Sequence, residues 1–290
     1  MNERMHAAGI LARRRIQETV IGPGLYLAMT VGLLLAAVLI VGFVRAIDSS
    51  GLNFEASPIY DLIARSLAGA FGVTMVDTLF AEGPYLIALY TAFIPVLLYL
   101  AIGSVFRIGL ERKIGAMEMI AYGPADGTSS ILAAFSKDVV LSVLYLVVLI
   151  AFFGLTAALY NLVLGPAFLT AVVAIPFLAF ALFAYGVLAS TLTDNSASAV
   201  GLFLGMVILF TAVLLSSFTV VTGYVRTVST ALAAIVQWVS PLFYWTLAIE
   251  SGELGNTGGF VGSLLAQLAL AAIVLALAHL AIRTRGVRPS

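Results

Sequence analysis

The sequence predicts an all-α membrane protein with six transmembrane helices, and two observations carry this prediction. The 290 residues are 62% hydrophobic and only 10% charged, with a mean hydropathy of +1.13, well outside the range of soluble globular domains. Several uncharged runs also exceed the roughly 20 residues that a helix needs to cross about 30 Å of hydrocarbon. We therefore expect residues 1–290 to form a single polytopic membrane domain.

Residues 1–22 form a basic segment before the first long apolar run. Small and apolar residues separate its arginines, and this pattern is typical of an amphipathic helix at the membrane interface, with Arg side chains among lipid headgroups. A basic tail that only sets the topology is the alternative. The sequence Gly22-Pro23-Gly24 ends the segment. Its arginines are Arg4, Arg13, Arg14 and Arg15.

Six long apolar runs follow, with Arg45 near the end of the first as their only charged residue, and each is long enough to form a span. Pro95 and Pro176 lie inside two of them and predict kinks, because proline removes one backbone hydrogen bond from a helix. Before the fifth span, the polar residues 193–196 predict a tight turn in which Asp194 or Ser196 caps the next helix. The predicted spans are residues 26–46, 85–106, 139–160, 167–190, 197–222 and 260–282.

The loop after the first span, residues 48–83, carries five acids and one base. Apolar residues recur in it at helical spacing between Ile59 and Phe71. This spacing predicts a helix that lies on the outer membrane surface or covers the end of the bundle. We expect its role to be structural.

Residues 228–249 form a seventh uncharged stretch, but the charge distribution argues against a seventh crossing. The basic N-terminal segment and the C-terminal arginines at 283, 285 and 288 should both be cytosolic, so the number of crossings is even. The stretch is therefore predicted to be re-entrant, with two half-helices broken at Ser240-Pro241. Tyr244 and Trp245 suit the outer membrane interface.

Composition and motifs exclude most catalytic functions. The chain has no cysteine, two histidines and zero net charge, so thiol catalysis, three-His zinc sites and nucleic-acid binding are not indicated. It has no Gly-Lys dipeptide and therefore no P-loop of its own. No acid or base lies in the middle of a predicted span, where ion-coupled transporters usually carry one. We expect neither enzyme activity nor a bound cofactor or metal, and any transport must draw its energy from another chain.

Residues 111–138 form a charged segment between the second and third spans. Both lysines and four acids of the chain lie in it. Glu111-Arg112-Lys113 is predicted to open a short amphipathic helix that ends at Gly123-Pro124. A second helix is predicted to start around residues 128–130 and to run into the third span, with Lys137 at the membrane boundary. A structured loop on the membrane surface is the alternative.

This segment resembles the cytosolic-loop signature of type-two ABC exporter permeases. The run Glu111-Arg112-Lys113-x-Gly115-x-Met117-Glu118-x-Ile120, followed by Pro124 and Lys137, is similar to the family pattern between spans two and three. Ser240-Pro241-Leu242-Phe243-Tyr244 resembles the family's N/S-P-x-x-Y motif after span five, and the order of the spans is similar over nearly the whole chain. The chain departs from the pattern at Ala116, at residues 125–127 and at Ser136, which leaves the contact surface less defined.

The resemblance implies a prokaryotic cell-membrane permease subunit that pairs with a second copy or a paralogue. Two cytosolic ATPase subunits, which carry the ATP and Mg²⁺, would bind the loop and rock the two halves to export a substrate. It also implies two sets of site residues. The ATPase-coupling residues are Glu111, Arg112, Ile114, Gly115, Met117, Glu118 and Pro124, and the outer re-entrant residues are Ser240, Pro241 and Tyr244.

Within the first set, Glu111 and Glu118 are expected to make charged contacts with the ATPase, while Ile114 and Met117 fill an apolar groove on it. A six-span secondary transporter and a membrane assembly scaffold without transport remain as alternative functions.

Overall fold

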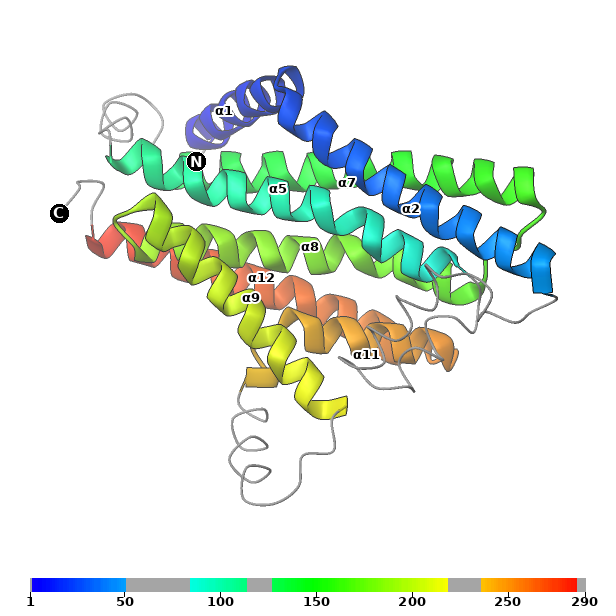
Figure 1. The fold of residues 1–290 in the computed structure, drawn as a ribbon. Helices are drawn as coiled ribbons and strands as arrows, with labels where there is room; N and C mark the ends of the chain where they lie inside the picture. Colours follow the sequence, from blue (N-terminus) through cyan, green and yellow to red (C-terminus); the bar gives the residue numbers. More distant parts are fainter. Residues whose placement is uncertain (1, 51–83, 114–126, 219–235, 286–290) are drawn as a thin grey trace.

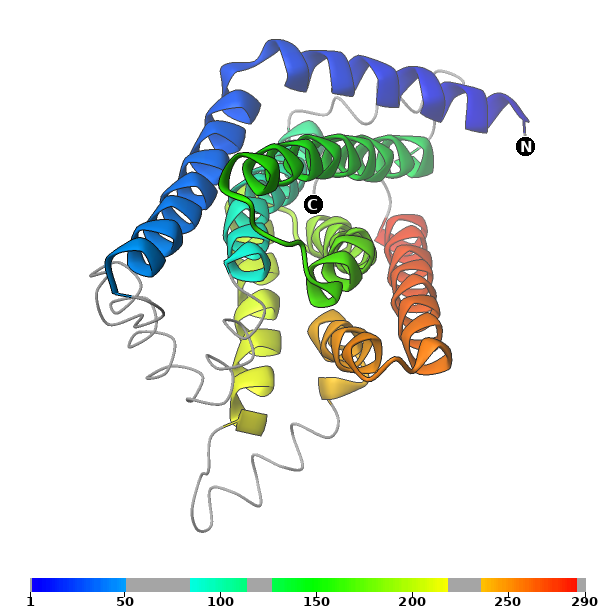
Figure 2. The ribbon, with the colours of Figure 1, turned by 90° about the vertical axis from the view of Figure 1, so that its right-hand side faces the viewer.

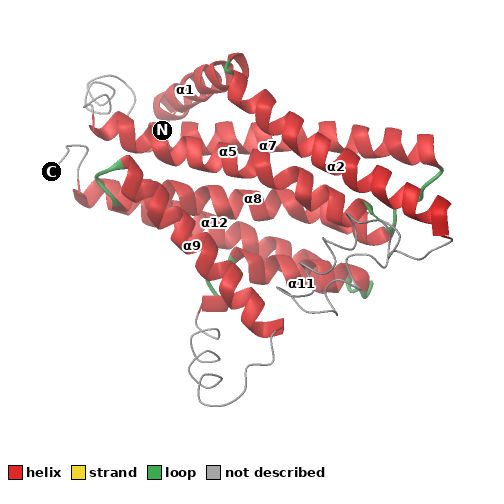
Figure 3. Ribbon diagram, in the orientation of Figure 1, coloured by secondary structure: helices red, strands yellow, loops and turns green. Residues whose placement is uncertain are grey.

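The computed structural model describes residues 2–50, 84–113, 127–218 and 236–285, and the regular structure in these ranges is entirely α-helical (Figure 1, Figure 3). Eight helices are defined there. They are α1 (Asn2–Ile21), α2 (Pro23–Ser50), α5 (Tyr85–Lys113), α7 (Gly127–Tyr160), α8 (Pro166–Leu192), α9 (Ser196–Phe218), α11 (Pro241–Glu253) and α12 (Thr257–Arg285).

Six of these helices are long and apolar enough to cross a membrane, as the sequence predicts. They are α2, α5, α7, α8, α9 and α12, and they identify the chain as a multi-pass membrane protein. Several are longer than the predicted spans. α7, with 34 residues, is about 50 Å long at 1.5 Å per residue, so it extends well beyond about 30 Å of hydrocarbon.

α8 lies in the centre of the bundle, packed against α5, α7, α9, α11 and α12 (Figure 2). α5 forms the second hub, because it also contacts α2, α7 and α9. α1 turns sharply away from α2 and packs along the first part of α7 (Figure 1). α1, the end of α5, the start of α7 and the end of α12 therefore lie together at one end of the bundle.

The helix ends follow from local sequence. Pro166 begins α8 at its first turn, where the absent N–H has no intrahelical partner in any case. The turn before α9 is where predicted. The side-chain Oδ1 of Asn195 accepts a hydrogen bond from the Ala197 N–H at 3.1 Å, so Asn195 caps the first turn of α9. The sequence analysis named its neighbours Asp194 and Ser196 for this role, and Asn is a comparable cap.

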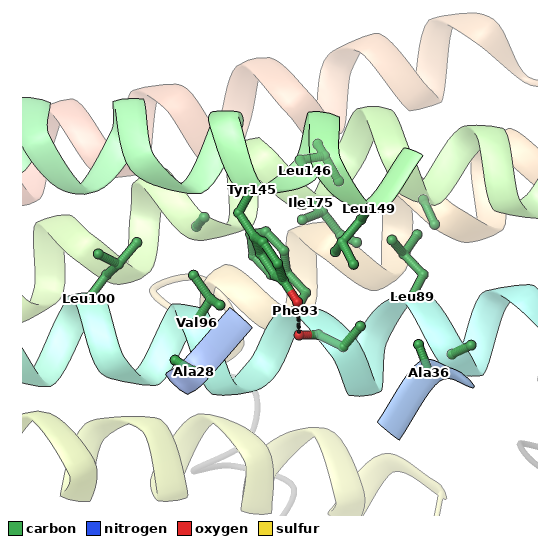
Figure 4. Close-up of a cluster of buried hydrophobic side chains, with 14 of the residues drawn as sticks. Ala28, Ala36, Leu89, Phe93, Val96, Leu100, Tyr145, Leu146, Leu149 and Ile175 are labelled. Carbon is green, nitrogen blue, oxygen red and sulfur yellow. Dashed lines mark hydrogen bonds between the residues drawn. The ribbon is translucent and has the colours of Figure 1, made fainter. Parts of the chain in front are cut away.

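The main core joins α2, α5, α7 and α8 around the part of α5 that contains Pro95 (Figure 4). The Tyr145 hydroxyl on α7 donates a hydrogen bond to the backbone oxygen of Ala92 on α5 at 3.0 Å, drawn as a dashed line in Figure 4. On α2, a Cβ at Gly32 would lie within 2.3 Å of both of these oxygens. Only glycine therefore allows α2 to approach this crossing so closely.

Two predictions about the charged segment can be compared with the structure. Glu111-Arg112-Lys113 does not open a separate helix, because α5 continues without a break through Lys113. The reason is that helix-forming residues follow the span directly, and the one glycine near the boundary, Gly109, packs against Ser196 inside the helix and does not stop it. The second prediction is confirmed: α7 begins at Gly127 and runs into the third span as one helix. Residues 59–71, 114–126 and 228–235 lie outside the described ranges.

Candidate functional site

A cluster of charged side chains joins α1, α5 and α7 at the end of the bundle where these helices meet. We call it the charged end, and its members on these helices are Arg14, Arg15, Glu18, Arg107, Glu111, Ser130, Lys137 and Asp138. One part of the cluster lies on the face of α1 that packs against α7. Ala8, Ala12 and Arg15 are buried there at helical spacing, so the two alanines allow α1 to approach α7 and carry Arg15 into the interior.

Arg15 bridges the end of α5 and the first turn of α7. Its Nη2 donates to the Glu111 Oε2 at 2.6 Å and to the Ser130 Oγ at 2.7 Å. Its Nη1 donates to the Ser130 backbone oxygen at 3.1 Å. The guanidinium side chain is only 5% exposed. Removing one partner from a buried ion pair costs about 3–5 kcal/mol, so these contacts hold three helices together.

The other carboxylate oxygen of Glu111 continues the cluster. Oε1 accepts from the Arg107 Nε at 3.0 Å, one turn earlier on α5. Arg107 in turn lies 2.6 Å from Glu18 Oε2, and Glu18 also pairs with Arg14 at 2.9 Å. Charges of alternating sign therefore run from the exposed surface of α1 to the buried Arg15. Both oxygens of Glu111 are used inside the chain.

The surroundings shift the pKa values of the two titratable groups on α1 that anchor this cluster. Burial lowers the pKa of the Arg15 guanidinium, and the Glu111 carboxylate opposes that effect. Burial by itself would raise the pKa of Glu18, but hydrogen bonds from Arg107 and Arg14 outweigh it and lower that pKa below its ordinary value. The lowered pKa of Glu18 means that its carboxyl group is charged at neutral pH.

A second ion pair lies deeper along α7. The Lys137 Nζ is 2.8 Å from the Asp138 Oδ1, and the two side chains are only 8% and 1% exposed. The Ser104 hydroxyl on α5 and the guanidinium of Arg15 lie near enough to act on the same carboxylate. The sequence analysis placed Lys137 at the membrane boundary. The structure buries it together with its neighbour, so α7 carries a paired charge within the protein interior.

Apolar and neutral polar contacts surround these charges. Ile108, Ile131, Val187 and Ile282 belong to one buried cluster that joins α5, α7, α8 and α12. The Thr128 Oγ1 and the His279 Nδ1 lie 2.9 Å apart and link the start of α7 to α12. The first turns of α7 are thus held on several sides before the helix enters the core.

The predicted coupling residues are only partly described. Glu111 and Arg112 lie in the last turn of α5, whereas Ile114, Gly115, Met117, Glu118 and Pro124 fall outside the described ranges. Among the described residues, no group of three or more His, Asp and Glu side chains is arranged to hold a metal ion. The ion pairs and hydrogen bonds of the charged end fix α1, α5 and α7 relative to one another.

At the opposite end, α11 and α12 form a helical hairpin that contains the second predicted set (Figure 1). Ser240 is extended and buried, and α11 begins at Pro241, as predicted for the break. The Tyr244 hydroxyl donates to the Trp238 backbone oxygen at 3.0 Å, and Tyr185 of α8 donates to the Val239 oxygen at 2.5 Å. The tyrosine of the S-P-x-x-Y sequence therefore secures the turn just before its own helix.

No protein-family model matches this chain, and no curated protein is significantly similar to it.

The sequence analysis did not assign Arg15, Arg107, Ser130 or Asp138 to the site. The sequence did contain one indication that Arg15 is buried. Arg15 lies on the same helix face as Ala8 and Ala12, whereas Arg13 and Arg14 do not. Its partners lie 96 and 115 residues away along the chain, so no local pattern could identify them.

Proposed function

We propose that the chain is the permease subunit of an ATP-binding-cassette exporter, with ATP hydrolysis supplied by separate cytosolic subunits. The proposal rests first on the resemblance of residues 111–124 and 240–244 to the loop and outer motifs of type-two ABC permeases. In this proposal the charged end is cytosolic. The hairpin end, which consists of α11, the start of α12 and the turn between them, then faces the outside.

One structural observation supports this assignment most strongly. The charged segment connects two long candidate spans, and the helices on both sides of it are continuous: α5 to Lys113 and α7 from Gly127. A displacement at Lys113 or Gly127 would therefore act directly on a membrane helix. This is the arrangement that an external motor protein requires.

The form of the hairpin end is compatible with the same proposal. α11 has 13 residues, about 20 Å at 1.5 Å per residue, which is too short to cross about 30 Å of hydrocarbon. It is broken from the preceding residues at Ser240 and returns directly into α12. A helix of this length, covered by α8 and α12, fits the predicted re-entrant segment.

The geometry also divides the coupling residues into two groups. Glu111 is engaged by Arg15 and Arg107, so we assign it an internal role and not a contact with the ATPase. Arg112, Ile114, Gly115, Met117, Glu118 and Pro124 remain the proposed ATPase-contacting residues. In the proposal, the acid of Glu118 and the apolar side chains of Ile114 and Met117 provide the complementary surface.

The test is co-purification with the cognate P-loop ATPase, using the paired change Glu118→Arg and Met117→Asp. We expect binding to fall at least about tenfold, because a reversed charge and a buried acid each remove more than 1.4 kcal/mol of contact free energy. Glu250→Arg with Leu254→Asp is the matched control, because both side chains are exposed at the hairpin end. Undiminished binding of the first variant would refute the assignment. Transport that persists without any ATPase would favour a secondary transporter.

A further inference from the structure

Arg15 contacts both ends of the connection between α5 and α7. Glu111 lies three residues before residue 114, and Ser130 lies four residues after residue 126. One guanidinium group holds both at 2.6–2.7 Å, with a third hydrogen bond to the Ser130 backbone oxygen at 3.1 Å. The distance between the two ends of the connection is therefore set by a residue of a third helix, α1.

We propose that Arg15 is a positioning residue that clamps the two ends of the 114–126 connection to each other and to α1. With this clamp in place, α1, the last turn of α5 and the first turn of α7 move as one unit. α1 is then part of the moving element, in addition to any contact it makes with lipid. The consequence for ATP-driven movement rests on the proposed function, whereas the clamp itself does not.

Three features make arginine suited to this position. Its planar guanidinium presents several donors in fixed directions, so it can hold a carboxylate and a hydroxyl together, while a lysine ammonium acts as a single point. The side chain is 5% exposed, so water does not compete for these hydrogen bonds. Arg107 holds the second oxygen of Glu111 and fixes the direction in which that carboxylate points.

Neighbouring arginines on the same helix differ from Arg15 in environment. Arg13 is exposed and forms no ion pair within the described part of the chain. Arg14 is 75% exposed and pairs only with Glu18, one turn away on α1. Arg13→Met is therefore a matched control for Arg15→Met, with the same loss of charge on the same helix.

The clamp can be tested by spin-label distances in the full chain in lipid nanodiscs. The chain has no native cysteine, so labels at Lys113→Cys and Leu132→Cys are unique. Labelled chain is diluted with unlabelled chain so that only distances within one chain are measured. A second pair, Gln17→Cys with Lys113→Cys, reports whether α1 follows the connection.

With Arg15 present we expect one narrow distance distribution for each pair. Arg15→Met should widen both distributions by about twofold or more, because the ends are then free to fluctuate locally. Arg15→Lys should give an intermediate width, and Arg13→Met should leave the widths unchanged. Ser130→Ala is the milder variant if Arg15→Met does not fold, and it should widen the Lys113–Leu132 pair alone. Distributions of unchanged width in both Arg15→Met and Ser130→Ala would overturn the proposal.

The rate of ATP hydrolysis by the bound ATPase distinguishes a role of Arg15 in coupling from a purely structural role. It also tests the proposed function separately from the clamp. With the ATPase bound, Arg15→Met should retain binding but lose the change in ATP hydrolysis rate that the permease imposes. A normal response of the ATPase rate, in a variant with widened distances, would overturn the role in coupling. If wild-type chain binds no ATPase while the distances widen as expected, the clamp stands and the proposed function fails.

Discussion

The two ends of the bundle are built in different ways. At the charged end, α1, α5 and α7 are joined by side chains that lie 96 and 115 residues apart in the sequence. At the hairpin end, the turn between α11 and α12 is formed by backbone hydrogen bonds between residues only two to five positions apart. The charged end therefore depends on a few ion pairs between distant helices, whereas the hairpin end is specified locally.

The turn between α11 and α12 shows how neighbouring residues determine the structure of the hairpin end. Gly255 has a φ of +67°, and the Asn256 N–H donates to the Ser251 oxygen at 2.8 Å, which closes the last turn of α11. The Asn256 Oδ1 then accepts from the Gly259 N–H at 3.0 Å and caps α12. These contacts join residues within 251–259, so they depend on local sequence. The contacts of the charged end depend instead on how α1, α5 and α7 pack together.

The largest effect should come from removing the carboxylate at the centre of the charged end. Glu111→Ala leaves Arg15 buried without its acid and should lower the free energy of unfolding by about 3–5 kcal/mol. Glu18→Ala, in the same cluster but 37% exposed, should cost only about 0–1 kcal/mol. Thermal unfolding of the purified protein in matched detergent checks both. Equal effects of the two variants would contradict the comparison, because burial would then not decide the strength of these pairs.

Much of the fold could be predicted from composition and periodicity. The number of spans, the break at Ser240-Pro241 and the start of α7 near residue 127 depend on apolar run length and on proline. These signals are local, so a single sequence reveals them. The end of α5 could not be placed in this way, because nothing in residues 107–113 stops a helix and the change from apolar to charged residues was taken for a boundary.

The charged end was harder to predict for a different reason. The resemblance to the family's loop pattern assigned Glu111 to a contact with the ATPase. The carboxylate lies inside the cluster because Arg15 and Arg107 reach it from two helices. Similarly, Lys137 and Asp138 compensate each other in the interior, although either charge alone would be expected in water. Pairings across such separations follow from the packed fold and not from local pattern.

A smaller effect is expected at the hairpin end, where shape and not charge holds α11 against α8. A Cβ at Gly252 would lie 2.2 Å from the Thr170 Cγ2, so Gly252→Ala should destabilise the protein by about 1–3 kcal/mol. Thr170→Ala removes that atom and should recover part of the loss in a double-mutant cycle. Thermal unfolding of the single and double variants measures this coupling. If the two changes are simply additive, the close approach is not what specifies this contact.

The smallest effect concerns the pH dependence of the exposed part of the charged end. Hydrogen bonds from Arg107 and Arg14 outweigh burial and lower the pKa of Glu18 from its ordinary 4.5. Because the carboxyl binds its proton more weakly in the folded state, Glu18 contributes stability above pH 4.5, and this contribution is lost as the pH falls below that value. The free energy of unfolding of the wild type, measured from its unfolding midpoint, should therefore approach that of Glu18→Gln as the pH falls from 7 to about 3.5. The total change should be less than about 1 kcal/mol.

Glu250→Gln at the hairpin end is the control, since its exposed side chain forms no ion pair in the described part of the chain. A difference between wild type and Glu18→Gln that stays constant down to acid pH would mean that the Glu18 pairs do not strengthen the charged end, and that the buried contacts of Arg15 hold it alone.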